Sequence, residues 1–133
     1  MKGQLLQNKQ GAAAVEFAII LPVFVLILLG SIETCTMIFL QQSLEMAAYE
    51  GARVAIVPTT TSSNIESAAK QILTQRHIQD FSISVTPSDF QSAPYGTFVR
   101  VSVSVPCSSN SVIVGRFYSS QTLTGNVEMM KEY

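Results

Sequence analysis

The longest apolar run of the chain lies near its N-terminus. From Ala12 to Ile32 the residues are almost all apolar, and Glu16 is the only ionisable residue among them. A helix over this run would be roughly 31 Å long at ~1.5 Å per residue, and the hydrocarbon core of a bilayer is ~30 Å thick. The pattern therefore predicts a membrane-spanning helix over about residues 12–34. A buried core helix is the alternative, but too little chain remains to surround one.

Beyond Ile32 the helical spacing of apolar residues continues, now with small side chains. A stripe with intervals of three and four residues is formed by Leu44, Ala47, Ala48, Gly51, Ala52 and Ala55. Because a residue before proline disfavours the helical conformation, Pro58 predicts that the long helix covers residues 12–57. The stripe permits close backbone approach, either to the protein's own sheet or to another subunit. Glu50 and Arg53 are three residues apart and can pair across a helical turn.

The residues after Pro58 predict a small α+β domain. Ser63 followed by Glu66 resembles a capping box and predicts the start of a second helix. Three later stretches alternate apolar and polar residues, as strands do, and their apolar positions are Phe81, Ile83 and Val85, then Val99, Val101, Val103 and Val105, then Leu123, Val127 and Met129. Gly125 would be a weak point or bulge in the third strand. The expected fold class is α+β: a long N-terminal transmembrane α-helix followed by a domain, residues 58–133, of one helix packed on a three-stranded antiparallel sheet.

The few charged residues predict the orientation of the chain in the membrane. They make up 13% of the sequence, and the net charge is −1. Two lysines, Lys2 and Lys9, and no acid precede the apolar run. The charged residues that follow it are mainly acidic: Glu33, Glu45 and Glu50, against Arg53. By the positive-inside rule the N-terminus is cytoplasmic and the later domain lies outside. The chain offers no basic surface, so nucleic acid is not an expected partner.

The start of the apolar run does not have the order of an ordinary secretory signal. Such signals place small residues after the apolar core, but here Gly11 and three alanines precede it. One interpretation is a short leader, residues 1–11, that is cut between Gly11 and Ala12. The new amine of Ala12, whose ordinary pKa is near ~8, could pair with Glu16 of the same or a neighbouring subunit and offset the cost of a carboxylate in hydrocarbon. The other interpretation is an uncleaved signal anchor.

Several stretches resemble a known family. Residues 11–17, GAAAVEF, resemble the processing site of type IV prepilins, which has glycine before the cut and glutamate as the fifth residue after it. The stretch from Gly11 through Glu33 is similar to the TadE-like pilins of tight-adherence systems. Two later stretches share this similarity: the motif EGAR, formed by Glu50, Gly51, Ala52 and Arg53, and the C-terminal LTGNVEMMKE, residues 123–132.

The resemblance implies a minor pilin (pseudopilin) that prepilin peptidase processes after Gly11 and that acts in pilus assembly or initiation, and so in adhesion or secretion. Glu16 and Phe17 would guide subunit docking. The implied partners are the peptidase, a second minor pilin of similar build, a short major pilin, the inner-membrane assembly platform and the lipid bilayer. The chain would span the bacterial inner membrane once, with a periplasmic domain, and could enter an extracellular pilus. The alternative is a single-pass inner-membrane scaffold or sensor subunit that is neither cleaved nor incorporated into a filament.

No pattern typical of catalysis is present in the sequence. His77 is the only histidine, and there is no Gly-x-Ser-x-Gly, P-loop or Cys-x-x-Cys motif. We therefore expect that the protein is not an enzyme. We also expect no cofactor, no metal site and no small-molecule substrate.

Three further features carry structural expectations. Pro22, inside the apolar run, predicts either a kink or a weak point that lets the helix stretch. Cys35 and Cys107 are the only cysteines, and they either form a disulfide, which would close a long loop, or remain separate thiols. The apolar stretch 111–118 is expected to pack under the sheet rather than against a partner.

Overall fold

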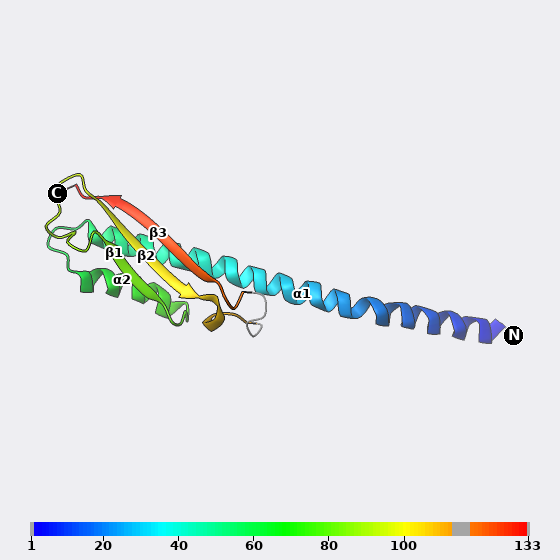
Figure 1. Cartoon of the computed structure of the whole chain (residues 1–133). Coiled ribbons are helices and arrows are strands. Elements are labelled where there is room, and N and C mark those ends of the chain that lie inside the picture. Colours follow the sequence, from blue (N-terminus) through cyan, green and yellow to red (C-terminus); the bar gives the residue numbers. More distant parts are fainter. Residues whose placement is uncertain (1, 113–117, 133) are drawn as a thin grey trace. The chain divides into compact units, whose positions relative to one another are not determined.

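The computed structural model describes residues 2–112 and 118–132, with side chains from Gly11 onward. Its elements are, in chain order, helix α1 (Lys2–Ala55), helix α2 (Ser62–Gln75), strand β1 (Ser82–Thr86), strand β2 (Phe98–Pro106), the short 3₁₀ helix η1 (Cys107–Ser109) and strand β3 (Thr122–Met130) (Figure 1). The strands pair antiparallel in the order β1-β2-β3. For the described residues, the α+β class with a long apolar N-terminal helix, a second helix and a three-stranded antiparallel sheet is therefore confirmed.

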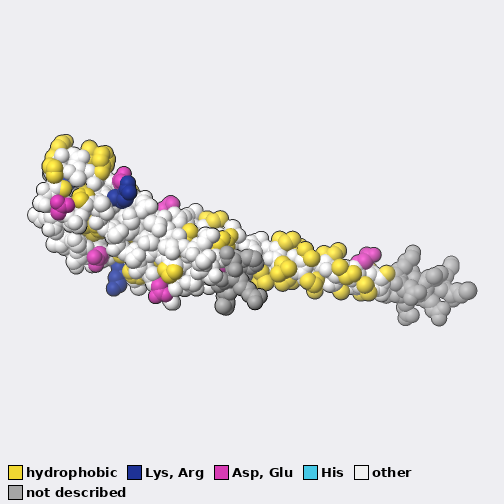
Figure 2. All heavy atoms as spheres, viewed as in Figure 1, with side chains coloured by type: hydrophobic (Ala, Val, Ile, Leu, Met, Phe, Trp, Pro, Cys, Tyr) yellow, Lys and Arg dark blue, Asp and Glu magenta, His cyan; other side chains and the backbone are white. Residues whose placement is uncertain are grey.

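The chain divides into two compact units, one up to Cys35 and one from Thr36 onward. The described residues of the first unit all belong to α1. Large apolar side chains between Val15 and Leu29 are exposed there, and Figure 2 shows hydrophobic side chains on the surface of this segment. The second unit contains the remainder of α1, α2 and the sheet. The cluster of buried hydrophobic residues begins at Met37, so this cluster belongs to the second unit.

One face of the sheet lies in the core and the other faces away from it. The fully buried positions of the central strand β2 are Val99, Val101, Val103 and Val105. The residues between them point to the opposite face, because successive side chains of a strand alternate. Val103 pairs with Ile83 of β1 on one side and with Gly125 of β3 on the other. The alternation in the sequence therefore predicted both the strands and their buried face.

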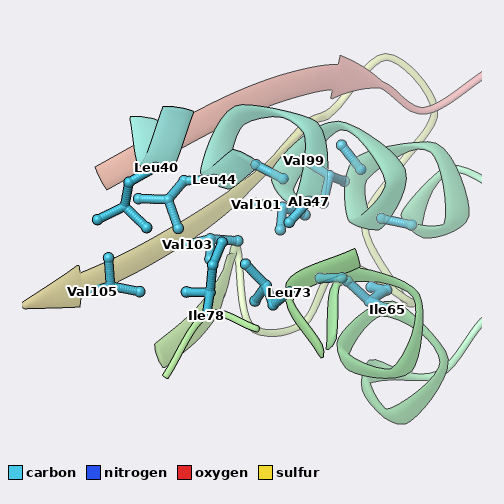
Figure 3. Packing of buried hydrophobic residues seen from close by; sticks show 14 of the residues in the cluster. Leu40, Leu44, Ala47, Ile65, Leu73, Ile78, Val99, Val101, Val103 and Val105 are labelled. Atoms are coloured by element: carbon cyan, nitrogen blue, oxygen red, sulfur yellow. The ribbon is translucent and has the colours of Figure 1, made fainter. Parts of the chain in front are cut away.

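The stripe of small residues on α1 packs against the sheet and α2 of its own unit. All of the stripe residues, Leu44 to Ala55, are buried. A Cβ at Gly51 would lie 3.1 Å from Cγ1 of Val101 and 3.4 Å from Cγ2 of Ile65. Figure 3 shows side chains of α1, β2 and α2 converging in one cluster. Of the two roles that the sequence left open, packing against the protein's own sheet is the one that the structure supports.

Gly125 is neither a bulge nor a weak point of β3. The register continues through it without interruption, with Val103 opposite. A Cβ at this position would lie 2.5 Å from the backbone nitrogen of Glu45 and 2.5 Å from the carbonyl carbon of Leu44. Glycine is required here because the backbone of α1 lies directly against the strand, a role that a glycine within a strand often has.

The capping-box prediction for α2 is wrong. The helix begins at Ser62, its N-cap is Thr61, and no side-chain hydrogen bond caps it. Backbone bonds hold this end instead, since the N–H groups of Asn64 and Ile65 donate to the carbonyl of Thr61. The local pattern Ser63–Glu66 therefore predicted the presence of the helix but not its first residue.

The other end of α2 is fixed to α1 by Arg76. Its guanidinium donates to Oγ of Ser43 at 2.9 Å and contacts Sδ of Met46 at 3.3 Å. It also lies over the ring of Phe39, 5.2 Å from the centroid. These contacts join the C-terminal end of α2 to the part of α1 that precedes the small-residue stripe. Because Ile65, near the start of α2, lies against Gly51, the two helices run antiparallel.

The long helix ends close to the predicted place. α1 stops at Ala55, and the N–H of Val57 donates to the carbonyl of Val54 in a final turn before Pro58. Residues 113–117, within the apolar stretch that was expected to pack under the sheet, lie outside the described residues.

Candidate processing and assembly site

The predicted cleavage site lies on an open part of α1. Gly11 and Ala12 are both exposed, and no atom lies within 4 Å of where a Cβ at Gly11 would stand. A peptidase must bind the backbone around the scissile bond, and this stretch is helical in the structure. Glycine is the poorest helix former after proline, so the helix opens most easily at Gly11.

Glu16 and Phe17 are both exposed on the first unit. Within the described part of the chain, Glu16 has no salt bridge or hydrogen bond. Positions 12 and 16 are four residues apart on one helical face, where Cβ atoms lie ~5–6 Å from each other. The backbone therefore places Glu16 within reach of an amine at Ala12, although the pairing itself remains a prediction.

The apolar run presents its side chains outward along its whole length. Its large exposed residues are Val15, Phe17, Ile19, Ile20, Leu21, Val23, Phe24, Val25, Leu26, Ile27, Leu28, Leu29 and Ile32. Among the described residues, α1 is the one helix that is long and apolar enough to cross a membrane. A surface this apolar is unstable in water, and its length fits a bilayer. It indicates a membrane-anchored protein.

Pro22 lies inside this helix, which continues on both sides of it. A proline removes one backbone donor and displaces the carbonyl four residues earlier. Hydroxyl groups bond the backbone further along the run, since Ser31 donates to the carbonyl of Ile27 at 2.8 Å and Thr34 to that of Gly30 at 2.9 Å. Such bonds keep polar side chains satisfied in an apolar environment.

The EGAR motif combines two structural roles. Gly51 and Ala52 are buried against the core, whereas Nη1 of Arg53 lies 3.8 Å from Oε2 of Glu50 on the surface. The predicted pairing of Glu50 with Arg53 is thus confirmed. An exposed pair of this kind contributes only ~0.3–0.5 kcal/mol, so the motif acts mainly through the two small residues that let α1 approach the sheet.

The two cysteines occupy different environments. Cys35 is exposed, whereas Cys107 is buried where β2 continues into η1. The structure holds no disulfide between the described cysteines. It therefore agrees with the alternative in which the two thiols remain separate.

The described residues offer no cluster of three or more metal-ligating side chains. His77 is exposed and follows α2 with a positive φ of 56°, so it is a helix-end residue. Glu33, one of the acids after the apolar run, is buried. That the protein is not an enzyme remains a prediction.

The structure gives physical roles to the C-terminal stretch that sequence patterns did not assign. Glu128 forms a salt bridge with Arg100, its cross-strand neighbour. Nζ of Lys131 donates to the carbonyl oxygens of Phe90, Gln91 and Ala93 at 3.2, 2.9 and 3.2 Å. One lysine thereby holds the loop between β1 and β2. The strand register could have indicated the first contact, but nothing local indicates the second.

An apolar, exposed N-terminal helix joined to a packed α+β unit defines a membrane-anchored protein with a small folded domain. A family model described as TadE-like protein matches residues 11–53. The match covers about a third of the chain, and over these residues the resemblance to the family seen in the sequence is confirmed. The C-terminal stretch 123–132 lies outside the match. No curated protein and no solved structure matches the chain.

Proposed function

We propose that this chain is a minor pilin, or pseudopilin, of a tight-adherence type pilus. One observation carries the proposal: the TadE-like match begins at Gly11, directly before the exposed apolar run 12–32 of α1, in which Glu16 is the only carboxylate. A plain membrane anchor needs neither feature, and a carboxylate in the membrane costs at least ~2.5 kcal/mol near the centre of a helix. A subunit that moves from lipid into a helical filament can use both.

The proposed cycle starts with an uncleaved inner-membrane precursor. Prepilin peptidase removes residues 1–11, and the amine of Ala12 becomes a cation next to Glu16. A buried carboxylate is tolerated when an opposite charge lies beside it, so Glu16 favours docking against a neighbour that supplies or shares that cation. Phe17 packs beside it in the same contact. The subunit then acts in assembly or initiation of the pilus, and thereby in adhesion or secretion.

The proposed location follows from the charge pattern and the apolar helix. The N-terminus lies in the cytoplasm, the helix crosses the inner membrane once, and the second unit lies in the periplasm or on an extracellular pilus. The proposed partners are prepilin peptidase, a second minor pilin of similar build, a short major pilin and the inner-membrane assembly platform.

Replacement of Gly11 tests the processing step. Gly11→Ala should slow cleavage about tenfold or more, equivalent to ~1.4 kcal/mol of lost transition-state stabilisation, because a methyl group at the scissile residue crowds the peptidase and stiffens the helix. The measurement is a pulse-chase of precursor and mature chain on gels.

Gly30→Ala is the matched control for this experiment. Gly30 lies in the same helix, and an added Cβ there also meets no atom within 4 Å, so processing should not change. Unchanged cleavage of Gly11→Ala would refute the leader assignment, whereas a wild-type chain that is not cleaved at all would favour the scaffold or sensor subunit.

A further inference from the structure

Both outer strands of the sheet present open edges in the described part of the chain. Just beyond the ends of the β2–β3 ladder, the N–H of Lys131 bonds the carbonyl of Thr97, and the N–H of Cys107 bonds that of Gln121. The odd-numbered residues of β3 therefore bond β2, and the even-numbered ones turn their backbone groups outward, since antiparallel strands alternate in this way. Among these outward groups of the described chain, only the carbonyl of Thr124 has a partner, Nε2 of Gln41 at 3.1 Å.

The edge of β1 is open by the same alternation. The even-numbered residues of β2 bond β1, so Ile83 and Val85 turn their N–H and C=O groups away from the sheet. No described residue bonds these groups. Long open edges pair readily with further strands.

A helix forms a shallow groove beside each edge. The groove beside β3 is lined by Gln42, Glu45, Met46, Tyr49 and Val127. The groove beside β1 is lined by Glu66, Lys70, Phe81, Ser82 and Ile83. Met46 and Tyr49 are 45% and 49% exposed, which leaves apolar surface beside the β3 edge for side chains of an added strand.

The directions of the edge strands favour pairing with a second copy of the chain in the same orientation. β1 and β3 are each antiparallel to β2 and therefore parallel to one another. All copies of one membrane-anchored chain share an orientation, so β1 of one copy can approach β3 of the next without reversal. Antiparallel pairing of two β3 strands would instead make the two α1 helices run in opposite directions.

The charges beside the two edges are complementary at matching levels. Ile83 and Gly125 both pair with Val103, and Gly125 lies against Glu45, so the two grooves lie at one level of the sheet. α2 runs antiparallel to α1. Since Ile65 lies against Gly51 and Arg76 bonds Ser43, Lys70 lies near the level of Glu45. Two copies side by side therefore place Glu45 of one opposite Lys70 of the other.

We propose that the β1 edge of one copy pairs in parallel with the β3 edge of the next, so that the sheet continues from copy to copy. Glu45 then faces Lys70 of the neighbour. The contact uses a different surface on each copy, so it extends into a row and does not close as a dimer. It goes beyond the proposed pilin function, because it needs shared membrane anchoring but no cleavage after Gly11.

Cysteine crosslinking in membranes tests this contact. Ser84 and Asn126 both pair with Ser102, point away from the core and are exposed. Within one chain they are two strand spacings apart, about 9.6 Å, which is too far for a disulfide. The full-length variant Ser84→Cys/Asn126→Cys, in a Cys35→Ser background, should form a ladder of dimers, trimers and larger species under oxidation. Each single variant should not.

Two matched controls sharpen the result. Ser84→Cys/Thr122→Cys moves one thiol four residues, roughly 13 Å, along β3 and should crosslink severalfold less. Lys70→Glu should weaken the Ser84/Asn126 ladder severalfold, and Glu45→Lys in the same chain should restore it. Both positions are exposed, and the exchange at Glu45 removes one bond within its chain, from Nε2 of Gln41 at 3.0 Å.

Three outcomes would overturn the proposal: no ladder from the double variant, dimers from Asn126→Cys alone, or a ladder that Lys70→Glu does not change. The experiment is run with prepilin peptidase present and absent. A ladder in both membranes supports the edge contact even if the chain is never cleaved, so failure of the pilin proposal remains distinguishable from failure of this one.

Discussion

At two positions, Gly125 and Glu16, we relate the residue type to a neighbouring group, which is close in space at Gly125 and close in the chain at Glu16. At Gly125 the absence of a side chain sets the distance between α1 and β3, because the backbone of Leu44 and Glu45 occupies the place of a Cβ. At Glu16 the proposed function gives the charge a partner, the amine that cleavage after Gly11 would create. In both cases the residue type follows from a neighbour that local periodicity does not show.

Replacement of Gly125 should destabilise the second unit. Gly125→Ala forces α1 away from β3, and such overpacking costs ~1–3 kcal/mol of unfolding free energy. Thermal or chemical unfolding of the full chain in detergent, followed by circular dichroism, measures the change. Asn126→Ala, at an exposed position of the same strand, is the control and should stay within ~0.5 kcal/mol. Wild-type stability of Gly125→Ala would contradict the close packing.

Replacement of Glu16 should separate membrane insertion from assembly. Glu16→Ala removes a charge from hydrocarbon, so insertion becomes easier and cleavage after Gly11 stays largely intact. Incorporation into pili should fall at least severalfold, because the partner of the Ala12 amine is lost. The measurement is the amount of the chain in sheared pili relative to the membrane fraction.

Two isosteric or conservative variants complete this series. Glu16→Gln keeps the size of the side chain and should fail in the same way, whereas Glu16→Asp keeps the charge and should retain part of the incorporation. Wild-type incorporation of Glu16→Ala would show that the carboxylate does not guide docking.

At the scale of elements, α1 presents two surfaces in succession along one helix. Up to Ile32 its large apolar side chains are exposed, and from Leu44 to Ala55 its small side chains are buried. Large exposed residues suit lipid or a helical bundle, and small buried ones allow close contact with a sheet. The change in side-chain size therefore separates the exposed apolar segment of α1 from the segment that packs on the sheet.

The contact of Arg76 with α1 should stabilise the end of α2. Arg76→Ala removes the bond to Ser43 and the stacking on Phe39, together worth ~1–2 kcal/mol. Faster hydrogen exchange of the last turn of α2 in the full chain reports the loss. Arg76→Lys should recover little, since lysine lacks the planar fork. Lys70→Ala, an exposed position on the same helix, is the control; equal exchange in Arg76→Ala and Lys70→Ala would refute this role.

The sequence predicted most elements but not the contacts between them. Alternation located the buried valines of β2, and helical spacing located the stripe on α1, because burial imposes a period on each element. The first residue of α2 was missed because backbone bonds to Thr61 replace a side-chain cap there. Gly125 was misinterpreted, and the role of Lys131 went unpredicted, because both depend on segments distant in the chain. The roles of Glu16 and of cleavage at Gly11 remain predictions.

At the scale of the whole molecule, the TadE-like family model matches part of α1 and not α2 or the sheet. The match covers residues 11–53, which include the exposed apolar segment and most of the stripe that packs on the sheet. β1 and β3, which carry the edges proposed for contact between copies, lie outside the match.

The intact mass and N-terminal sequence of the chain, isolated from membranes with prepilin peptidase present and absent, test the central claim most directly. We predict a start at Ala12 when the peptidase is present and at Met1 when it is absent. A start at Met1 under both conditions would contradict the proposal, because an uncleaved chain would be a fixed membrane anchor and not a pilus subunit.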